Sequence, residues 1–535
     1  MKRLFLAVVA LVAVTISASA VAIVPQPLSI SKHNNTFVLL PSTMLVCDVE
    51  EFAPIVKYSQ EYLALDHFAK VAPKSNYISL ALDKSLVEEE YHLSVSRDAV
   101  QIVAGGYGGA FYAMQTLFQL LPSEVYTKQM RLPAVVKGCD VKDKPKFAYR
   151  GFMLDVARTF MTKENVLRYI DYIAYHKINK LHWHLTDGQG WRIEIKKYPE
   201  LTKVGSVRKE TLVGLYTKKN RKFDGKPYGG FYTQDEVREV VRYASERYID
   251  VIPEIDMPGH MVAALASYPH LGCTGGPYEV RTLWGISRDI LCAGRESTFE
   301  FVEGVLAEVL ELFPSKYIHI GGDEAPKHRW KACPECQKRI QEEGLKDEHE
   351  LQSYFTHRVE KFLAKHGRRL IGWDEILEGG ISKTATIMAW RGANRGIKAA
   401  QLGNEVIMTP RHYCYLDYCQ TSDHDANNEP ICGAGNGKRY QMPIRKVYSF
   451  DPYDQLNEEQ RKAIVGVQGN MWTEYVATFD HVQHMVLPRI AALAEVGWTY
   501  GEKNYDEFAR RMHLLRKLYD KCGYKYAPYF FNGIE

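Results

Sequence analysis

The sequence predicts an α/β protein, a (β/α)8 TIM barrel preceded by a small α+β domain. Short alternating strands occupy the first part of the chain, and beyond Tyr149 short apolar strands alternate with amphipathic helices. Polar residues stand at the ends of those later strands. The chain of 535 residues also exceeds what one hydrophobic core usually supports, so two domains are expected.

The first 20 residues have the pattern of a secretory signal peptide. A basic start precedes an apolar run, and Ala18 and Ala20 form an A-x-A cleavage pattern. The alternative, a retained membrane anchor, is disfavoured because the apolar run is shorter than the ~20 residues that span a bilayer. We therefore expect cleavage near Val21, export to the periplasm or the medium, and no membrane contact afterwards.

The predicted N-terminal domain covers residues 21–144. Its strands include YHLSVS from Tyr91 and AVQIVA from Ala99, and a helix follows from Ala110. The segment KDKPKFAYR marks the exit from this domain. With a formal charge of only +4, the chain gives no reason to expect a nucleic acid or another polyanion as partner.

The predicted barrel covers residues 145–535 and ends in a C-terminal helix. Thr162 is expected to begin one barrel helix, and Thr233 with Glu236 forms a capping box for another. The eight expected strands are GFMLDV from Gly151, KLHWHL from Lys180, DVIPEI from Asp250, YIHIGG from Tyr317, RLIGW from Arg369, ATIMAW from Ala385, EVIMT from Glu405 and IVGVQG from Ile464.

Functional residues of a TIM barrel lie at the carboxyl ends of its strands. Seven of the eight expected ends carry a carboxylate, arginine, histidine or tryptophan, a concentration that packing alone does not explain. These residues are Asp155, Arg158, His184, Asp187, Glu254, Asp256, His260, Asp323, Glu324, Trp373, Asp374, Trp390, Arg391, Trp472 and Glu474.

The segment HIGGDE from His319 is the most informative of these ends. Neighbouring side chains of a strand face opposite ways, so two glycines are needed to turn both Asp323 and Glu324 toward one cavity. Two carboxylates in a largely apolar pocket cannot both ionise easily, so one is expected to have a raised pKa. This arrangement predicts general acid/base chemistry.

Four motifs in order resemble glycoside hydrolase family 20, the β-N-acetylhexosaminidases. They are HIGGDE, HWHLTDGQGWRIEI from His182, PEIDMPGH from Pro253 and VQGNMWTE from Val467. The resemblance runs from about Pro145 to Trp498 and, more loosely, over the preceding domain. It implies an exo-acting retaining hydrolase that removes terminal N-acetylhexosamine from glycans or oligosaccharides and needs no cofactor or metal.

The resemblance also implies the catalytic roles. Glu324 would protonate the leaving oxygen and later deprotonate water, while the 2-acetamido group of the substrate attacks the anomeric carbon. Asp323 would orient the acetamide and stabilise the oxazolinium intermediate, a substrate-assisted exception to the usual two-carboxylate scheme.

Binding roles follow from the same resemblance. Trp373, Trp390 and Trp472 would form a box around the acetamide, although tryptophans at these positions could equally be core residues without the family match. The polar partners implied are Tyr415 and Asp417 for the acetamide carbonyl and sugar hydroxyls, Arg158 and Glu474 for the outer hydroxyls, and Asp187 with His260 to support the acid. Many members have two acids in the HLTDD stretch, whereas this chain has Gly188 in the second position.

The ten cysteines suggest disulfides in an exported protein. Cys273 and Cys292 bracket a Gly-rich segment that is expected to be a stapled loop. For Cys333 and Cys336 a structural disulfide is favoured over zinc, because no second CxxC or HxxxH pattern lies nearby. His182 and His184 share a strand face, but the resemblance implies no metal there.

Two alternatives remain at the level of sequence. A binding protein without catalysis would keep Arg158 and the tryptophans but lack the acid. A barrel exo-glycosidase with two distant carboxylates would use Glu254 and Glu375. The sequence leaves open the choice between N-acetylglucosamine and N-acetylgalactosamine, the natural glycan and the oligomeric state.

Overall fold

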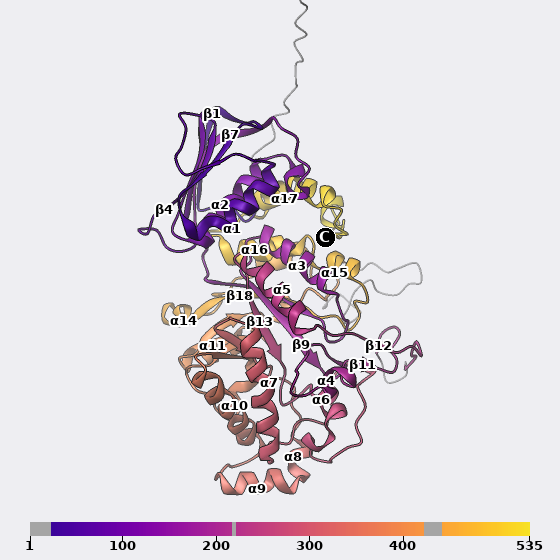
Figure 1. Cartoon of the computed structure of the whole chain (residues 1–535). Coiled ribbons are helices and arrows are strands. Elements are labelled where there is room, and N and C mark those ends of the chain that lie inside the picture. Colours follow the sequence, from indigo (N-terminus) through magenta and orange to yellow (C-terminus); the bar gives the residue numbers. More distant parts are fainter. Residues whose placement is uncertain (1–22, 217–220, 422–440, 535) are drawn as a thin grey trace, which may run out of the picture.

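The computed structural model describes residues 23–216, 221–421 and 441–534, which form two domains stacked along the long axis of the molecule (Figure 1). The smaller N-terminal domain, in indigo and purple, lies at the top of this view, and the barrel lies below it. The predicted signal peptide of residues 1–20 lies outside the described residues.

The N-terminal domain is built on a mixed seven-stranded sheet with the strand order β1-β7-β5-β6-β4-β2-β3. Helices α1 and α2 lie between this sheet and the barrel (Figure 1). The elements are β1 (Ser29–Leu39), β2 (Met44–Cys47), α1 (Ala53–Leu63), β3 (Phe68–Ala69), β4 (Tyr77–Leu82), β5 (Tyr91–Val95), β6 (Ala99–Ala104), α2 (Tyr107–Leu120) and β7 (Ala134–Asp143). The strands expected at Tyr91 and Ala99 are confirmed.

Helix α2 begins at Tyr107, earlier than the Ala110 that the sequence suggested. Gly108 and Gly109 are part of the helix because its first turn packs very closely on its surroundings. A Cβ on Gly108 would lie 2.6 Å from the Tyr248 ring, and one on Gly109 would lie 2.3 Å from the carbonyl oxygen of Glu90. These glycines therefore permit close packing rather than ending the helix.

All eight predicted barrel strands are present and parallel. They run in the order β9-β13-β14-β15-β16-β17-β18-β8, and pairing of β8 with β9 closes the barrel. Their bounds are β8 (Tyr149–Asp155), β9 (Lys180–Asp187), β13 (Asp250–Ile255), β14 (Tyr317–His319), β15 (Arg369–Trp373), β16 (Thr386–Ala389), β17 (Glu405–Met408) and β18 (Ile464–Met471). A short strand, β10 (Gly190–Trp191), folds back antiparallel onto the end of β9.

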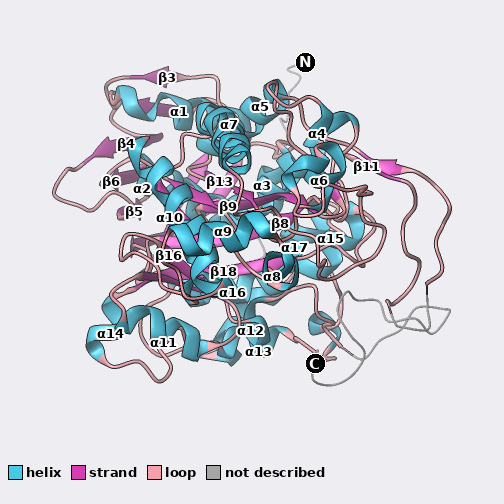
Figure 2. Ribbon diagram, turned by 90° about the horizontal axis from the view of Figure 1, so that it is seen from below, coloured by secondary structure: helices cyan, strands magenta, loops and turns pink. Residues whose placement is uncertain are grey.

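Helices surround these strands, as the view from below shows (Figure 2). The two predicted helix starts are confirmed: Thr162 accepts a hydrogen bond from the Asn165 amide, and Thr233 forms the capping box with Glu236. The helices are α3 (Lys163–Tyr175), α4 (Glu200–Lys203), α5 (Gln234–Ser245), α6 (Val262–Ser267), α7 (Glu296–Leu312), α8 (His328–Ala332), α9 (Pro334–Glu342), α10 (Glu348–Lys365), α11 (Ala393–Gln401), α12 (Arg411–Cys414), α13 (Ile444–Ser449), α14 (Glu458–Lys462), α15 (Phe479–Val486), α16 (Arg489–Trp498) and α17 (Tyr505–Lys521).

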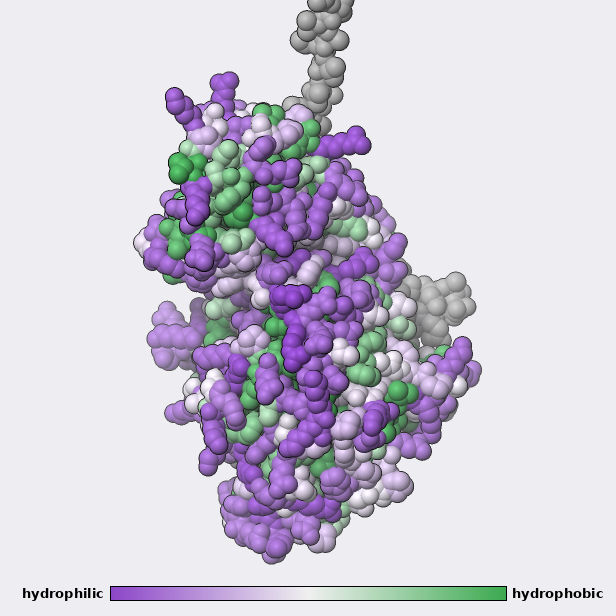
Figure 3. Space-filling view, viewed as in Figure 1, coloured by the Kyte–Doolittle hydropathy of each residue, from purple (hydrophilic) through white to green (hydrophobic). Residues whose placement is uncertain are grey.

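The two domains share a buried contact around Arg150. Its guanidinium donates to the hydroxyl of Tyr112 on α2 at 2.8 Å and lies 5.0 Å from the Trp498 ring. Hydrophilic residues cover most of the face seen in Figure 3, and hydrophobic side chains appear there in small groups. Among the helices of the described ranges, none has both the length and the apolar character that crossing a membrane requires.

The cysteine expectations need correction. Cys273, Cys292, Cys333 and Cys336 are all free thiols, so neither the stapled loop nor the CPEC disulfide is present. The reason lies in the tertiary structure. The loop after β13 and the segment after β14 fold against each other, which brings all four sulfurs into one cluster.

Candidate active site

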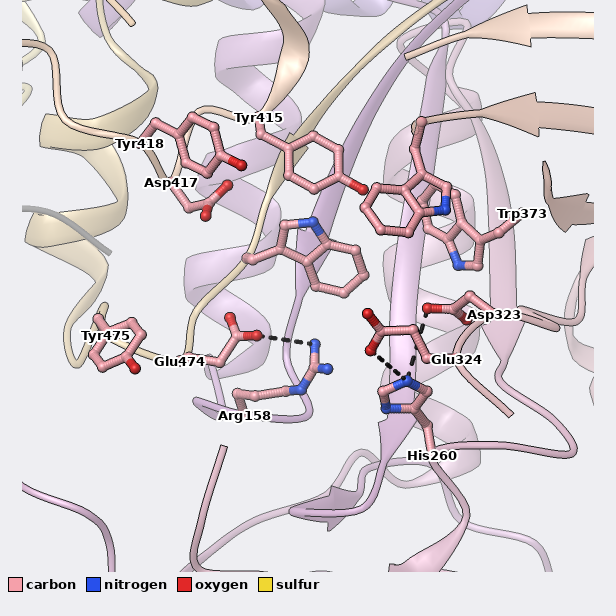
Figure 4. A pocket seen from close by; sticks show the side chains of 12 residues that line it. Arg158, His260, Asp323, Glu324, Trp373, Tyr415, Asp417, Tyr418, Glu474 and Tyr475 are labelled. Atoms are coloured by element: carbon pink, nitrogen blue, oxygen red, sulfur yellow. Dashed lines mark ion pairs between the residues drawn. The ribbon is translucent and has the colours of Figure 1, made fainter. Parts of the chain in front are cut away.

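A pocket of about 210 Å³ lies at the carboxyl ends of the barrel strands. It combines carboxylates and one arginine with a wall of aromatic rings (Figure 4). Its lining residues are Arg158, His260, Asp323, Glu324, Trp373, Trp390, Tyr415, Asp417, Tyr418, Trp472, Glu474 and Tyr475. The structure thus brings together ten of the eleven site residues that the sequence singled out, although they come from separate loops.

The adjacent carboxylates reach this pocket through an unusual backbone path. Strand β14 ends at His319, and φ is positive at Gly321 (66°) and Gly322 (91°). A Cβ at Gly321 would lie 1.7 Å from an oxygen of Asp256, so only glycine fits there. Glu324 itself has a φ of 44°, a conformation that a residue other than glycine adopts at a cost in energy. As the sequence predicted, the glycines turn Asp323 and Glu324 to the same side.

His260 lies next to both carboxylates and forms an ion pair with each. Its Nε2 atom lies 3.7 Å from Asp323 Oδ2 and 3.5 Å from Glu324 Oε2, and these two ion pairs are drawn in Figure 4. Burial lowers the pKa of His260, but the surrounding carboxylates, Asp187 foremost, outweigh burial and raise it well above the usual value. The imidazole is therefore a cation that places positive charge beside the carboxylate pair.

The raised pKa that the sequence predicted for one of the two acids occurs at Asp323, the acid that the family resemblance assigns to the acetamide and not to proton donation. Burial raises the pKa of Asp323 well above its usual value, and the negative charge of Asp256 adds to this effect. Asp256 is buried in the same way, which raises its pKa to about 7. The two carboxyls and His260 have oxygen and nitrogen atoms within 4.8 Å of one another, so their protonation states depend on each other.

Arg158 enters the pocket from the loop after β8. Its Nη2 atom lies 2.6 Å from Asp187 Oδ2, and its Nη1 atom lies 3.2 Å from Asp155 Oδ2 and 3.9 Å from Glu474 Oε1. The guanidinium also lies 5.0 Å from the Trp472 ring centre. These contacts hold a buried cation in one orientation.

Asp187 is the predicted site residue that does not line the pocket. Its side chain is only 1% exposed and lies beneath Arg158 and His260. The Nδ1 atom of His260 lies 3.1 Å from Asp187 Oδ2. Burial raises its pKa, but Arg158 and His260 together outweigh burial and hold it well below its usual range. Asp187 is thus a fixed anion that acts through its two neighbours.

The aromatic side of the pocket consists of three tryptophans and Tyr415. The Trp390 ring stacks at 6.0 Å from Tyr415 with an interplanar angle of 17°, and Trp472 lies 5.9 Å from Trp373. Two indole N–H groups are turned to carboxylates outside the box: Trp373 donates to Glu254 at 2.8 Å and Trp390 donates to Glu375 at 2.9 Å. The rings are thereby fixed with their apolar faces toward the cavity.

Asp417 and Glu474 line the side of the pocket that lies across from Asp323 and Glu324 (Figure 4). Burial raises the pKa of both carboxyls, and repulsion between them contributes at Asp417. Oδ1 of Asp417 is buried and has no hydrogen-bond partner among the described residues. A buried acceptor without a partner is costly in free energy, so this oxygen is suited to accept a hydrogen bond from a hydroxyl group of a ligand.

A layer of buried ionisable side chains lies inside the barrel, next to Trp373. Glu254 is fully buried, forms a hydrogen bond with His184 Nδ1, and lies 2.9 Å from His182 Nε2 and 3.1 Å from His319 Nδ1. The HxH pair of β9 therefore contributes to this network. Because Trp373 also donates to Glu254, this carboxylate is enclosed and does not face the pocket.

Two pocket residues were not predicted, Tyr418 and Tyr475. Each directly follows a predicted residue, Asp417 and Glu474, and alternation along an extended segment would normally turn it away.

Gly188 occupies the position at which many family members have a second acid. The Arg281 side chain fills the space beside this glycine, since a Cβ on Gly188 would lie 2.8 Å from Arg281 Cδ. A second acid at position 188 would therefore displace Arg281.

A (β/α)8 barrel with paired carboxylates in an aromatic pocket at its carboxyl end defines a glycoside hydrolase. The chain belongs to glycosyl hydrolase family 20: the model of the family's catalytic domain matches residues 147–500, and that of its domain 2 matches residues 20–144.

Relatives in other organisms agree with this assignment. A "Beta-hexosaminidase" of Porphyromonas gingivalis is 45% identical over 94% of this chain, which spans 64% of that relative's length. A "Beta-hexosaminidase" of Vibrio furnissii is 36% identical, with coverage of 90% of this chain and 77% of the relative.

Solved structures show the same architecture. The exo β-N-acetylglucosaminidase of Vibrio harveyi in complex with N-acetylglucosamine superposes with a TM-score of 0.82 at 32% identity, covering 94% of this chain and 78% of that one. The β-N-acetylhexosaminidase of Streptomyces coelicolor gives a TM-score of 0.80 at 30% identity, covering 94% and 96%.

Proposed function

We propose that this chain is an exo-acting retaining β-N-acetylhexosaminidase that hydrolyses terminal, non-reducing N-acetylhexosamine residues with help from the substrate's own acetamide. One observation carries the proposal: Asp323 and Glu324 are adjacent in the chain and both face the same small aromatic pocket. Two neighbouring acids can serve two neighbouring sites on one sugar, the leaving oxygen and the 2-acetamido group.

In the first step Glu324 donates its proton to the glycosidic oxygen as the bond from the anomeric carbon to that oxygen breaks. The acetamide carbonyl oxygen supplies the electron pair that forms a new bond to the anomeric carbon. Asp323 accepts a hydrogen bond from the acetamide N–H. As the oxazolinium ring forms, this N–H group carries part of the positive charge. The buried position of Asp323 strengthens this interaction because little water screens it.

In the second step Glu324, now a carboxylate, removes a proton from water. The water oxygen bonds to the anomeric carbon, and the acetamide carbonyl leaves with its electron pair. Each step inverts the anomeric centre, so the product retains the starting configuration. Glu324 ends protonated and ready for another cycle.

The shape of the pocket favours action on a single terminal sugar. Its volume of about 210 Å³ is below that of sites for drug-sized ligands. Asp417 and Glu474 lie across the pocket from the catalytic pair, and Arg158 lies between Glu474 and His260 (Figure 4). These three side chains would bind outer hydroxyl groups. The three tryptophans and Tyr415 would press the acetamide against the ring, and such proximity supplies a large part of the rate.

The two alternative functions are disfavoured by the geometry. A binding protein without catalysis has no need for a strained backbone at Glu324. A two-carboxylate glycosidase would require Glu254 to reach the sugar, but three histidines and Trp373 enclose it. Glu375 accepts a hydrogen bond from the indole N–H of Trp390 and is not among the residues that line the pocket.

The test is a comparison of two chromogenic substrates with the same leaving group. We expect hydrolysis of the N-acetyl-β-glucosaminide and no measurable hydrolysis of the β-glucoside, which lacks the acetamide. A thiazoline that mimics the oxazolinium intermediate should inhibit competitively. Equal rates on both substrates, or indifference to the thiazoline, would contradict the proposed mechanism.

We further propose that the protein acts after export, in the periplasm or outside the cell. The proposal is supported by the basic, apolar and small-residue pattern of residues 1–20. N-terminal sequencing of the protein from cell fractions tests it, with a mature start near Val21 expected. A chain that begins at Met1 in the cytoplasm would overturn it.

A further inference from the structure

Four cysteines form a cluster away from the catalytic pocket. The cysteine cluster consists of Cys273, Cys292, Cys333 and Cys336. The first two lie on the segment between α6 and α7, and the last two lie next to and within α9, at the end of the molecule opposite the N-terminal domain (Figure 1). None of the four lines the catalytic pocket or enters the proposed mechanism.

The sulfur positions have the geometry of a metal site. Sγ of Cys292 lies 3.6 Å from that of Cys336 and 3.8 Å from that of Cys333. Sγ of Cys273 lies 3.8 Å from that of Cys336, and all four sulfurs lie within 4.8 Å of one another. A zinc ion bound to four sulfurs at about 2.3 Å requires sulfur–sulfur separations of about 3.8 Å in a regular tetrahedron.

We propose that the cysteine cluster binds one structural zinc ion. Four thiolates at tetrahedral spacing are a ligand set that zinc prefers, and they leave no position open for water or substrate. Cys292, Cys333 and Cys336 are buried, at 0%, 3% and 0% exposure, which matches a closed site rather than a catalytic one. The proposal does not depend on the proposed hexosaminidase activity.

A pair of disulfides is the competing arrangement. A disulfide needs a sulfur separation of about 2.05 Å and a distinct partner for each cysteine. Here Cys292 is nearly equidistant from Cys333 and Cys336, and Cys336 is also close to Cys273. A single central ion satisfies all four sulfurs at once, whereas any pairing divides the cluster.

The local backbone supports thiolate ligands. Cys333 is the N-cap of α9, Pro334 is the first helical residue and Cys336 lies in the first turn. The positive end of the helix dipole therefore faces two of the sulfurs and favours their anionic form. A Cβ on Gly294 would lie 2.2 Å from the backbone of Glu335, so a glycine is needed where the two segments meet.

The ion would connect the two segments that carry the catalytic groups. His260 precedes Cys273 on the segment after β13, and Glu324 precedes Cys333 on the segment after β14. Asp289 and Arg329 join the same segments through an ion pair of 2.7 Å. The ion would thus hold together the two segments that carry His260 and the carboxylate pair, without touching the substrate.

The first experiment measures metal and thiols in the full-length protein purified from zinc-containing medium without chelator. We expect about one zinc ion per chain, released when a mercurial reagent titrates the thiols. After zinc is removed under reducing conditions, added Co²⁺ should give the visible absorption of tetrahedral cobalt thiolate. Iron in place of zinc, two disulfides found by mass spectrometry in this region, or reduced thiols that bind neither ion would overturn the proposal.

Cysteine variants with matched controls provide the second experiment. Cys273→Ser should lose most of the bound zinc, whereas Cys522→Ser, a free and partly exposed cysteine elsewhere, should keep it. If Cys273→Ser is poorly soluble, Cys292→Ser is compared with Cys414→Ser, both fully buried in the native protein. Full zinc retention in a cluster variant would contradict the assignment.

The structural role predicts a separate readout. Chelation of the wild-type protein should lower Tm by roughly 5–15 °C, and zinc should restore it, because the ion binds only the folded form. Chelated Cys522→Ser should behave like the chelated wild type. A Tm that does not respond to chelation, although zinc has left, would show that the ion does not hold these segments together.

Discussion

The carboxylate of Asp187 lies 2.6 Å from Nη2 of Arg158, beneath the floor of the pocket. Because His260 Nδ1 lies 3.1 Å from the same oxygen, one buried anion orients both the group proposed to bind hydroxyls and the group beside the acids. The two ends of the pocket are therefore linked through a residue that the substrate does not touch.

Replacing Asp187 by asparagine tests this link. The change leaves two buried cations without their shared partner, and we expect it to lower the free energy of unfolding by about 3–5 kcal/mol. It should also raise KM and lower kcat, because Arg158 and His260 both lose their orientation. Urea unfolding and steady-state kinetics are the measurements, and Asp235→Asn, which breaks an exposed ion pair, should change stability by less than about 1 kcal/mol.

The sign of the pH dependence follows from the lowered pKa of Asp187. Its carboxylate stabilises the fold fully above its unfolded pKa of about 3.9, and this contribution is lost as the pH falls toward the lower folded value. The stability difference between wild type and Asp187→Asn should therefore be largest between about pH 4 and pH 6.5. It should shrink below about pH 4 as Asp187 is protonated, and above about pH 6.5 as His260, whose pKa Asp187 raises, loses its proton. A difference that grows on acidification below about pH 4 would show that Asp187 is not the anion described.

Glu324→Gln should remove proton donation and leave the pocket intact. We expect a loss of about 10²–10⁴-fold in kcat, the usual contribution of a positioned general acid, with KM little changed. A substrate with a strongly acidic leaving group needs less proton donation, so its first step should suffer least. Turnover at the wild-type rate on an ordinary glycoside would refute the assignment.

Asp323→Asn is expected to act on the acetamide rather than on the leaving group. The neutral asparagine cannot balance the positive charge of the oxazolinium ring. We therefore expect kcat to fall and the thiazoline to bind much more weakly. Glu324→Gln is the matched comparison, because it should retain most of the thiazoline affinity. Equal weakening in both variants would mean that the two acids do not have separate roles.

The coupling of Asp323 to Asp256 predicts the acidic limb of the pH profile. Asp323 must be ionised to support the acetamide, so kcat/KM should fall as the pH drops through its raised pKa. Asp256→Asn removes a neighbouring negative charge while its amide oxygen can still accept from the Gly322 N–H. The acidic limb should then move to lower pH, because one cause of the raised pKa of Asp323 has been removed. A shift in the opposite direction would contradict this coupling.

The eight strands and the carboxylate pair were predictable from the sequence because they depend on local patterns. Apolar runs alternating with amphipathic helices indicated the strands, and the two glycines of HIGGDE predicted that both acids face one cavity. The enclosure of Glu254 was not predictable. It depends on strand register, which pairs Glu254 with His184 on one side and with His319 on the other.

The cysteine cluster shows a second limit of the sequence. A CxxC motif was visible at Cys333, but the other two sulfurs come from a segment that is separated from it by all of α7 and β14. Only the fold of the two loops brings the four together. Asp187 illustrates the same point, since its motif indicated involvement in the site but not its position beneath the pocket.

Gly322→Ala tests whether the glycines of HIGGDE aim the two acids. Gly322 has a φ of 91°, and a Cβ there would lie 2.5 Å from Ile376 Cγ2, so the variant combines backbone strain with a steric clash. Gly380→Ala is the matched control, because its φ is 101° but its Cβ would meet nothing closer than 3.9 Å. Both variants should lose roughly 1–2 kcal/mol of stability from strain.

Only Gly322→Ala should also lose activity, by about 10²-fold, because a displacement near 1 Å of the acids is enough to disrupt catalysis. Adding Ile376→Ala removes the clash but not the strain, so the double variant should recover part of kcat and little stability. Measurements of kcat and of urea unfolding separate the two effects. If Gly322→Ala and Gly380→Ala lose the same small fraction of activity, the aim of the carboxylates does not depend on this turn.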